Sequence, residues 1–341
     1  MEKSKREPGK GKKRVDAAEC IHCHVCRKNC DFLSKYKIDI GDRKQLEELA
    51  YHCFLCGKCT EVCPIGIDGR EEILSIRRKK SKDSQGKPGE KGYRMLLAEK
   101  KNYLFRNYRN AAGKSVLFPG CNFPSFYPKT TEKLVRLLRE KTGMGVVYDC
   151  CGKPVAELGM KDQEEKIIRG IEARLEKHGI IELVTMCPNC YYFLKPRLSV
   201  RVTGIYEKLR ELELGSQIPG GDSIFTPCPD RETYEWLEDI RTFLAQECRP
   251  IQGVQCCGLG GCAGVKEVEL SKKMTGKLAE EMAERRKEGL DVLYTYCASC
   301  AGNLARNGCE NVQHVLSEIL DVHEKPDTGR SMLNRMRTKL L

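Results

Sequence analysis

CIHCHVCRKNC, residues 20–30, and CFLCGKCTEVCP, residues 53–64, share the spacing C-x2-C-x2-C-x3-C, and the second stretch ends in a proline. The x2 spacing lets three successive thiolates face one iron-sulfur cube, whereas the fourth cysteine, displaced by x3, faces a second cube. The ligand sets therefore cross between the two stretches. The predicted ligands are Cys20, Cys23, Cys26 and Cys63 for one 4Fe-4S cluster (the first ferredoxin set) and Cys53, Cys56, Cys59 and Cys30 for the other (the second ferredoxin set).

Structural zinc is the alternative for these eight cysteines, since C-x2-C pairs also bind zinc. A zinc site needs only four ligands, however, and gives no reason for a duplicated triplet followed by x3. Between the two stretches, Asp42 is a candidate N-cap for a helix whose Leu46, Leu49 and Ala50 share one face. This helical spacer predicts an all-α ferredoxin domain with two clusters over residues 15–80.

The composition limits the class of protein. The chain has 341 residues, of which 21 are cysteines, and a formal net charge of +12. Disulfide scaffolds reach such a cysteine density in short secreted chains, whereas this chain is long and opens with basic residues rather than an apolar leader. No run of apolar residues is long enough to span a membrane. We therefore expect a cytoplasmic globular protein whose thiols bind metal.

The positive charge lies entirely in residues 1–114, because residues 115–341 sum to zero. It concentrates in a basic tail at 1–14 and in residues 77–114. The polar stretch 81–92, with its glycines and proline, predicts a mobile connection within a linker and connecting helix over 81–114. A solvated tail and linker, an acidic protein partner or a nucleic-acid arm would each account for the charge. No aromatic stacking pattern accompanies the lysines, so we expect no nucleic-acid partner.

The second part of the chain contains an internal repeat. SVLFPGC matches SIFTPC, YDCCGKP matches VQCCGLG, and ELVTMCPNC matches DVLYTYCASC. Each copy reads C, then CCG, then C-x2-C. The cysteines are Cys121, Cys150, Cys151, Cys187 and Cys190 (the first CCG set) and Cys228, Cys256, Cys257, Cys297 and Cys300 (the second CCG set). We expect two tandem pseudo-symmetric domains over 115–220 and 221–325, followed by a second basic tail at 326–341.

Both copies predict the order β-α-β-α-β. The expected strands are 116–118, 146–148 and 183–186 in the first copy, and 224–226, a short piece at 254 and 292–296 in the second. The expected helices carry apolar residues on one face: Leu134 and Leu138; Ile168, Ile171 and Leu175; Leu237, Ile240 and Leu244; and Leu270, Met274 and Leu278. This alternation predicts parallel sheets with right-handed crossovers, and the whole chain is then of the multidomain α+β class.

Each key cysteine follows the carboxyl end of a predicted strand, the edge at which open α/β sheets bind ligands. The five thiols of each copy are therefore expected to converge. Five thiolates exceed the four that zinc or an ordinary cube needs, so the pattern indicates an unusual cluster. Cys187 and Cys297 also begin helices, where the positive helix end favours the thiolate.

Alternatives remain for the CCG sets, namely two structural zinc sites, zinc in only one copy, or buried cysteines without redox activity. Three further cysteines, Cys248, Cys262 and Cys309, are expected to be ordinary core thiols, although Cys262 lies near Cys257 in the sequence.

The complete pattern resembles the heterodisulfide reductase family, as a fusion of its ferredoxin-like and cysteine-rich subunits. The layout is also similar to the iron-sulfur subunits of glycolate oxidase, of lactate utilisation systems and of anaerobic glycerol-3-phosphate dehydrogenase. The resemblance covers nearly the whole chain. It implies a noncubane 4Fe-4S cluster in each complete CCG set, with a disulfide cleaved between the two, so that all ten CCG cysteines would be catalytic ligands. The gaps before the CC pairs, 28 and 27 residues, are slightly shorter than usual, so the substrate walls would differ.

Two functions fit this resemblance. In the first, electrons enter an oxidoreductase subunit through the cubanes and reduce a disulfide, or flow in reverse as thiols are oxidised. In the second, the chain relays electrons from a flavin-containing partner subunit to a quinone or another carrier. No G-x-G-x-x-G follows a strand, so a partner would supply hydride chemistry. Met332, Met336 and Leu340 have helical spacing beside basic residues, which would allow at most a peripheral membrane contact.

Overall fold

The N-terminal domain is built from short helices. The computed structural model describes residues 15–340, so the predicted basic tail at 1–14 lies outside the described residues. The helices are α1 (Val25–Asn29), α2 (Asp31–Tyr36), α3 (Arg43–Leu49), α4 (Lys58–Val62) and α5 (Gly69–Asp83), with 3-10 turns at Ala17–Glu19 and Ala50–His52. Between the described residues of this domain, strand-like pairing is limited to one isolated bridge, Val15 to Ile67. The prediction of an all-α ferredoxin domain is confirmed.

The two cysteine motifs repeat in three dimensions as well as in sequence. The residue before α1, His24, and the residue before α4, Gly57, both adopt the left-handed conformation, with φ of 61° and 76°. This backbone turn lets each x2 loop reverse before a helix begins. Asp42 is the N-cap of α3 as predicted, but its carboxylate accepts a hydrogen bond from the backbone N–H of Asp39 at 2.6 Å instead of capping the helix.

The first α/β domain is a four-stranded parallel sheet covered by helices. Its strands are β1 (Ser115–Phe118), β2 (Gly145–Val146), β3 (Glu182–Thr185) and β4 (Arg201–Gly204), in the order β2-β1-β3-β4. Its helices are α7 (Phe123–Phe126), α8 (Pro128–Thr142), α9 (Lys153–Glu157), α10 (Lys161–Lys177), α11 (Pro188–Leu194) and α12 (Ile205–Glu211).

The second α/β domain repeats this arrangement. Its sheet contains β6 (Ser223–Phe225), β8 (Arg249–Pro250), β9 (Leu293–Thr295) and β10 (Val312–His314), all parallel, in the order β10-β9-β6-β8. Read from the other edge, this order corresponds strand for strand to that of the first sheet. The helices are α13 (Glu235–Arg241), α14 (Val268–Arg286), α15 (Ala298–Arg306) and α16 (Val315–Ile319), with 3-10 turns at Cys228–Asp230 and Gly260–Val265. The predicted tandem domains with parallel sheets are confirmed.

Several details of the predicted strands are wrong. Each sheet gains a fourth strand, β4 or β10, that the repeat did not indicate. Val254 is not in a strand; the edge strand β8 lies earlier, where Pro250 is tolerated because an edge position needs no N–H on its outer side. Leu244 is not helical, since α13 ends at Arg241 and Leu244 pairs in β7 (Leu244–Gln246) with β5 (Ile218–Gly220).

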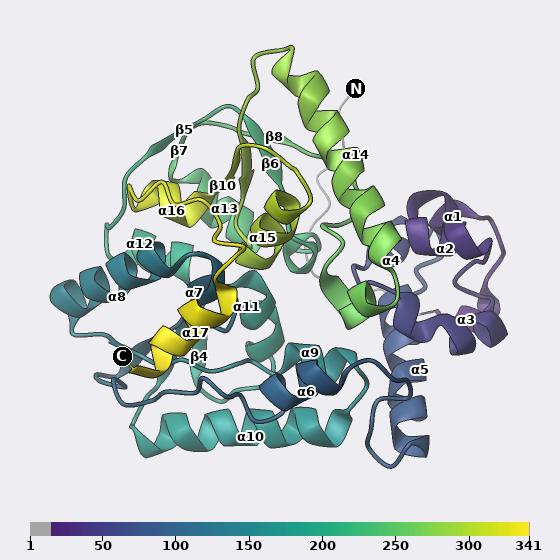
Figure 1. Ribbon diagram of the computed structural model, residues 1–341, viewed down its shortest axis with the longest axis horizontal. Coiled ribbons are helices and arrows are strands. Elements are labelled where there is room, and N and C mark those ends of the chain that lie inside the picture. The colour runs from purple at the N-terminus through teal and green to yellow at the C-terminus, as the bar shows by residue number, and fades with distance from the viewer. Residues whose placement is uncertain (1–14, 341) are drawn as a thin grey trace.

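The three domains pack as one body (Figure 1). Figure 1 shows the purple N-terminal helices at one side of the molecule, next to the green helix α14. Their buried core continues into both α/β domains, where it includes Val155 and Leu158 from the first and Leu270 and Met274 from the second. Glu267, only 1% exposed, accepts hydrogen bonds from Lys35, Tyr36 and His52 of the ferredoxin domain, each at 2.7 Å.

The predicted linker and C-terminal tail both contact the folded domains. Gly89 donates its N–H to the Tyr51 hydroxyl at 2.8 Å, and the linker continues as α6 (Arg94–Lys100). The tail forms α17 (Ser331–Leu340), whose buried Asn334 donates to the carbonyl of Ser125 at 3.1 Å. Its other side leaves Met332 and Met336 exposed.

Among the described residues, no helix is both long and apolar enough to cross a bilayer.

Arg77 links all three domains. The sequence places it in a basic run of the solvated linker type, but its side chain is 0% exposed. The guanidinium donates to the carbonyls of Ala50 and Cys53 in the ferredoxin domain, of Glu157 in the first α/β domain and of Gly261 in the second, at 2.6–3.0 Å. A planar fork with five N–H donors suits this arrangement better than the single ammonium of lysine.

We expect Arg77→Met to destabilise the assembled chain by about 3 kcal/mol or more, because four buried carbonyls would lose charged donors. That loss corresponds to a fall of roughly 6 °C in the thermal midpoint. The matched control is Arg78→Met, since Arg78 is partly exposed and pairs with Glu71, and it should change the midpoint little. Equal midpoints for the two variants, measured anaerobically by calorimetry, would contradict this role for Arg77.

Candidate metal centres

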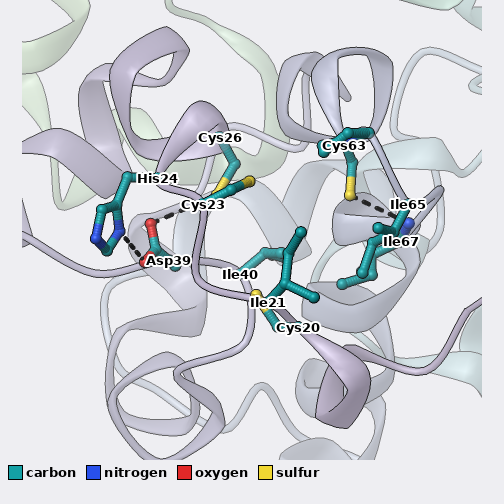
Figure 2. A pocket seen from close by; sticks show the side chains of 11 residues that line it. Cys20, Ile21, Cys23, His24, Cys26, Asp39, Ile40, Cys63, Ile65 and Ile67 are labelled. Carbon is teal, nitrogen blue, oxygen red and sulfur yellow. Dashed lines mark hydrogen bonds and ion pairs between the residues drawn. The ribbon is translucent and has the colours of Figure 1, made fainter.

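The four cysteines of the first ferredoxin set line one small hollow. Figure 2 shows Cys63 reaching this hollow from the side opposite Cys23 and Cys26, with Cys20 below. Ile21, Ile40, Ile65 and Ile67 supply apolar walls, and the backbone N–H of Ile67 donates to Cys63 Sγ at 3.3 Å. Cys30 is not among the lining residues. The structure therefore brings the fourth cysteine of the second motif to the first three of the first motif.

The second ferredoxin set gathers at the boundary with the second α/β domain. The side-chain N–H group of Gln255 lies 3.7 Å from Cys30 Sγ and 3.6 Å from Cys56 Sγ. Burial raises the pKa of Cys59, and the neighbouring thiols of Cys30, Cys53 and Cys56 raise it further. Both pieces of geometry support the crossed ligand sets, which remain a prediction.

The first CCG set forms one chain of contacting thiols at the carboxyl ends of β1, β2 and β3. Cys121 contacts Cys150, Cys150 contacts Cys151, Cys151 contacts Cys190, and Cys190 contacts Cys187. Hydrogen bonds from Cys150 and Cys190 lower the pKa of Cys151 to about 5 despite its burial. Cys187 is the N-cap of α11, with Pro188 in the first turn, as predicted.

The second CCG set forms two groups, one beside the ferredoxin domain and one beside the first CCG set. Cys228 and Cys256 contact each other, and Cys256 also contacts Cys56 of the ferredoxin domain. Cys257 contacts Cys300, and Cys300 contacts Cys297, the N-cap of α15.

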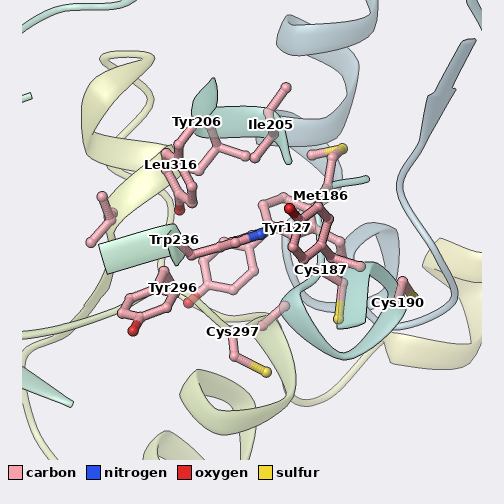
Figure 3. Packing of buried hydrophobic residues seen from close by; sticks show 14 of the residues in the cluster. Tyr127, Met186, Cys187, Cys190, Ile205, Tyr206, Trp236, Tyr296, Cys297 and Leu316 are labelled. Carbon is pink, nitrogen blue, oxygen red and sulfur yellow. The ribbon is translucent and has the colours of Figure 1, made fainter. Parts of the chain in front are cut away.

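Cys297 meets Cys187 of the first CCG set, and hydrogen bonds from Cys187 and Cys300 lower the pKa of Cys297 well below its usual range. Figure 3 shows Cys187 and Cys297 on facing elements beside Trp236 and Tyr127. The thiols of the first CCG set thus continue through Cys187 and Cys297 to Cys300 and Cys257. Cys228 and Cys256 form a separate group with Cys56 of the ferredoxin domain.

Buried cations accompany these thiols, and no motif in the sequence indicates them. Burial alone would lower the pKa of Lys100, but the neighbouring Cys121, Cys150 and Glu99 raise it, and the Glu99 carboxylate lies 2.7 Å from the ammonium. Burial alone would likewise lower the pKa of Arg231, but the neighbouring Cys228, Cys56 and Cys256 raise it.

The predicted linker also closes the first CCG set with aromatic side chains. Tyr103 and Phe105 pack in one buried cluster with Cys121 and Cys150. Their rings meet edge to face at 5.7 Å, and the Lys100 ammonium lies 5.2 Å from the ring centre of Tyr103. The stretch predicted as a connector therefore forms a wall of the candidate site.

The three leftover cysteines have ordinary surroundings. Cys248 and Cys309 are buried, and Cys309 contacts the carbonyl of Thr275 at 3.7 Å. Cys262 lies 3.5 Å from the carbonyl of Pro154, and burial raises its pKa to about 12.

The residues present fit iron-sulfur clusters. Iron-sulfur clusters are held by thiolates and stabilised by hydrogen bonds to sulfur. Thiols converge here in groups, and backbone N–H groups donate to Cys53, Cys63 and Cys256 at 3.2–3.4 Å. Buried cations beside them offset negative charge that would otherwise be costly to bury.

Comparison with protein families identifies the domains. The cysteine-rich (CCG) domain family matches residues 115–195 and 222–305, and the 4Fe-4S dicluster domain family matches residues 16–67. The resemblance to heterodisulfide reductase-related iron-sulfur proteins is thereby confirmed.

Curated relatives are similar to this chain at low identity. A subunit of the fumarate reductase (CoM/CoB) of Methanothermobacter marburgensis is 25% identical over 90% of this chain and 72% of its own length. An iron-sulfur protein of Methanococcus maripaludis is 25% identical over 84% of this chain, which spans 65% of that relative. EtfAB:quinone oxidoreductase of Syntrophomonas wolfei is 25% identical over 43% of this chain and 25% of its own length.

Among solved structures, a hypothetical protein from Helicobacter pylori has a similar fold. It aligns with a TM-score of 0.52 and 11% identity over 89% of this chain and 68% of its own.

We expect the crossed ligand sets to appear in cluster-loss variants. Cys20→Ser and Cys63→Ser should remove the same cubane signal from the electron paramagnetic resonance spectrum of the reduced protein, and Cys30→Ser should remove the other, each with a loss of about four irons. Cys309→Ser is the control and should keep both signals. The crossing would be contradicted if the Cys63→Ser and Cys56→Ser variants each lost the same signal while Cys20→Ser lost the other one.

Proposed function

We propose that this iron-sulfur protein, which joins a 4Fe-4S dicluster domain to two cysteine-rich CCG domains, is the electron-transferring and catalytic subunit of an oxidoreductase. Its reaction would be disulfide reduction or the reverse oxidation of two thiols, in the cytoplasm. The observation that carries this proposal is the contact between Cys187 and Cys297, which joins the first CCG set to the Cys257, Cys297 and Cys300 group of the second. The name of the Methanothermobacter relative, a reductase subunit, supports a redox role within a larger complex.

The ten CCG cysteines are the proposed ligands of two noncubane 4Fe-4S clusters, and the ferredoxin sets those of two cubanes. When bound, such clusters would supply single electrons. Reduction of a disulfide takes up two electrons and two protons, breaks the sulfur–sulfur bond and releases two thiols. The buried ammonium of Lys100, beside Cys121 and Cys150, would stabilise negative charge at sulfur during this change. Zinc in one CCG domain is the competing occupant.

The ferredoxin domain is the proposed electron entry. The first ferredoxin set lies nearer the surface, since Cys23 is exposed and Cys20 and Cys63 are partly exposed. The second set lies against the second CCG domain through Cys56 and Cys256. This order supports a path from an external redox partner, such as a flavin-containing subunit, inward to the CCG sets.

Loss of one CCG ligand should abolish turnover without loss of the cubanes. We expect Cys150→Ser or Cys256→Ser to eliminate disulfide-dependent oxidation of a reduced viologen dye, while the cubane signals of the ferredoxin domain persist. Cys309→Ser, the matched buried cysteine, should retain the rate. If both CCG variants kept the wild-type rate, the proposed catalytic role would be wrong.

A second candidate function is electron relay to a quinone at a membrane surface. One observation favours it: α17 docks by its polar residues Asn334 and Thr338 and leaves Met332, Leu333 and Met336 at least half exposed. Basic residues of the same helix accompany these apolar side chains, as in helices that bind anionic lipid surfaces. The name of the Syntrophomonas relative, a quinone oxidoreductase, agrees with such an acceptor.

Vesicle sedimentation tests this second function. If it holds, the protein should pellet with vesicles that contain anionic lipid, and Met332→Gln with Met336→Gln should release it. Met95→Gln is the control, because Met95 is 88% exposed on α6. If the protein stayed in the supernatant with these vesicles, relay to a quinone at a membrane surface would be contradicted.

A further inference from the structure

Gln255 occupies the boundary between the ferredoxin domain and the second CCG domain. It directly precedes Cys256, yet its side chain points to cysteines more than 190 residues away in the sequence. The residue is 7% exposed. A buried primary amide needs partners at both its oxygen and its nitrogen, or burial costs free energy.

The amide has a single orientation that satisfies its surroundings. Its Oε1 accepts the backbone N–H of Asp31 at 2.5 Å. Its Nε2 consequently faces Cys30 Sγ at 3.7 Å and Cys56 Sγ at 3.6 Å. A flipped amide would set an N–H against the N–H of Asp31 and an oxygen against two sulfurs, so the donor must face the thiols.

The two sulfurs that receive the amide belong to different motifs but to the same proposed ligand set. Arg231, the buried cation beside Cys56 and Cys256, donates a hydrogen bond to the backbone carbonyl of Gln255. Gln255 thus joins the second ferredoxin set, through its side chain, to the second CCG set, through its peptide link with Cys256.

We propose that Gln255 is a positioning residue that sets the reduction potential of the second ferredoxin cluster and holds it against the second CCG set. The inference rests on the proposed ligand sets. Hydrogen bonds to ligand sulfurs stabilise the more negative, reduced form of an iron-sulfur cluster and so raise its potential. A higher potential at this inner position favours movement of an electron from the first ferredoxin set toward the CCG domains.

Two substitutions separate the donor role from a tethering role. Gln255→Leu removes the donor and the contact with Asp31. Gln255→Glu keeps an oxygen that can accept from Asp31 but places a second oxygen, in place of the N–H group, against the two thiolates. Gln217→Leu is the control, since Gln217 is exposed and remote in sequence from any cysteine ligand.

The measurement is a potentiometric titration of the full-length, cluster-loaded protein, followed by electron paramagnetic resonance. The ratio of reduced to oxidised second cluster at a fixed potential should fall about tenfold in Gln255→Leu and further in Gln255→Glu. The first cluster is an internal reference and should not shift. Gln217→Leu should titrate as the wild type does.

Three results would overturn the inference: an unchanged second cluster in both variants, an equal shift of both cubanes, or a wild-type titration for Gln255→Glu beside a shifted Gln255→Leu. The last would show that only the tether to Asp31 matters. Failure of the proposed disulfide chemistry would instead appear as turnover in the Cys150→Ser and Cys256→Ser variants, with these potentials unaffected.

Discussion

Close packing of many buried thiols is the constraint on which the rest of the structure depends. Thiolates without counter-charges would repel one another and lose hydration. Buried cations offset this cost. Arg231 lies beside Cys228 and Cys56, and Lys100 lies beside Cys121 and Cys150. Arg77 donates to the carbonyl of Cys53. Arg77 and Arg231 each contact groups of more than one domain, and Lys100 lies in the connecting segment, so the sulfur sites and the domain interfaces stabilise each other.

This constraint changes the meaning of the charge asymmetry. The +12 charge of residues 1–114 indicates, from sequence alone, a solvated tail and linker. In the structure, Arg77 is buried and Lys100 lies against thiols of another domain. Part of the basic excess is therefore internal charge balance, while Arg78 and Lys79 remain at the surface in ion pairs. A count of charges along the chain cannot separate these two uses, because burial depends on tertiary contacts.

Local sequence predicts the repeated architecture well, since strand ends and helix starts carry their own signals. Cys187 and Cys297 begin helices after short apolar strands, as their flanking residues indicate. The fourth strands escape prediction because β4 and β10 follow the last cysteine pair of each copy, outside the repeated cysteine segments from which the strands are inferred. Leu244 has helical spacing, but pairing with β5 overrides it. Gln255, Arg231 and Lys100 belong to no motif, because each contacts cysteines that only the tertiary fold brings to it.

The central claim is that the cysteines form an electron path of four clusters rather than a set of structural sites. Anaerobic purification followed by iron, sulfide and zinc quantification tests it most directly. About sixteen irons per chain, with matching sulfide and no zinc, are expected for four 4Fe-4S clusters. About eight irons together with stoichiometric zinc would contradict the claim, because the CCG domains would then be structural modules attached to a ferredoxin.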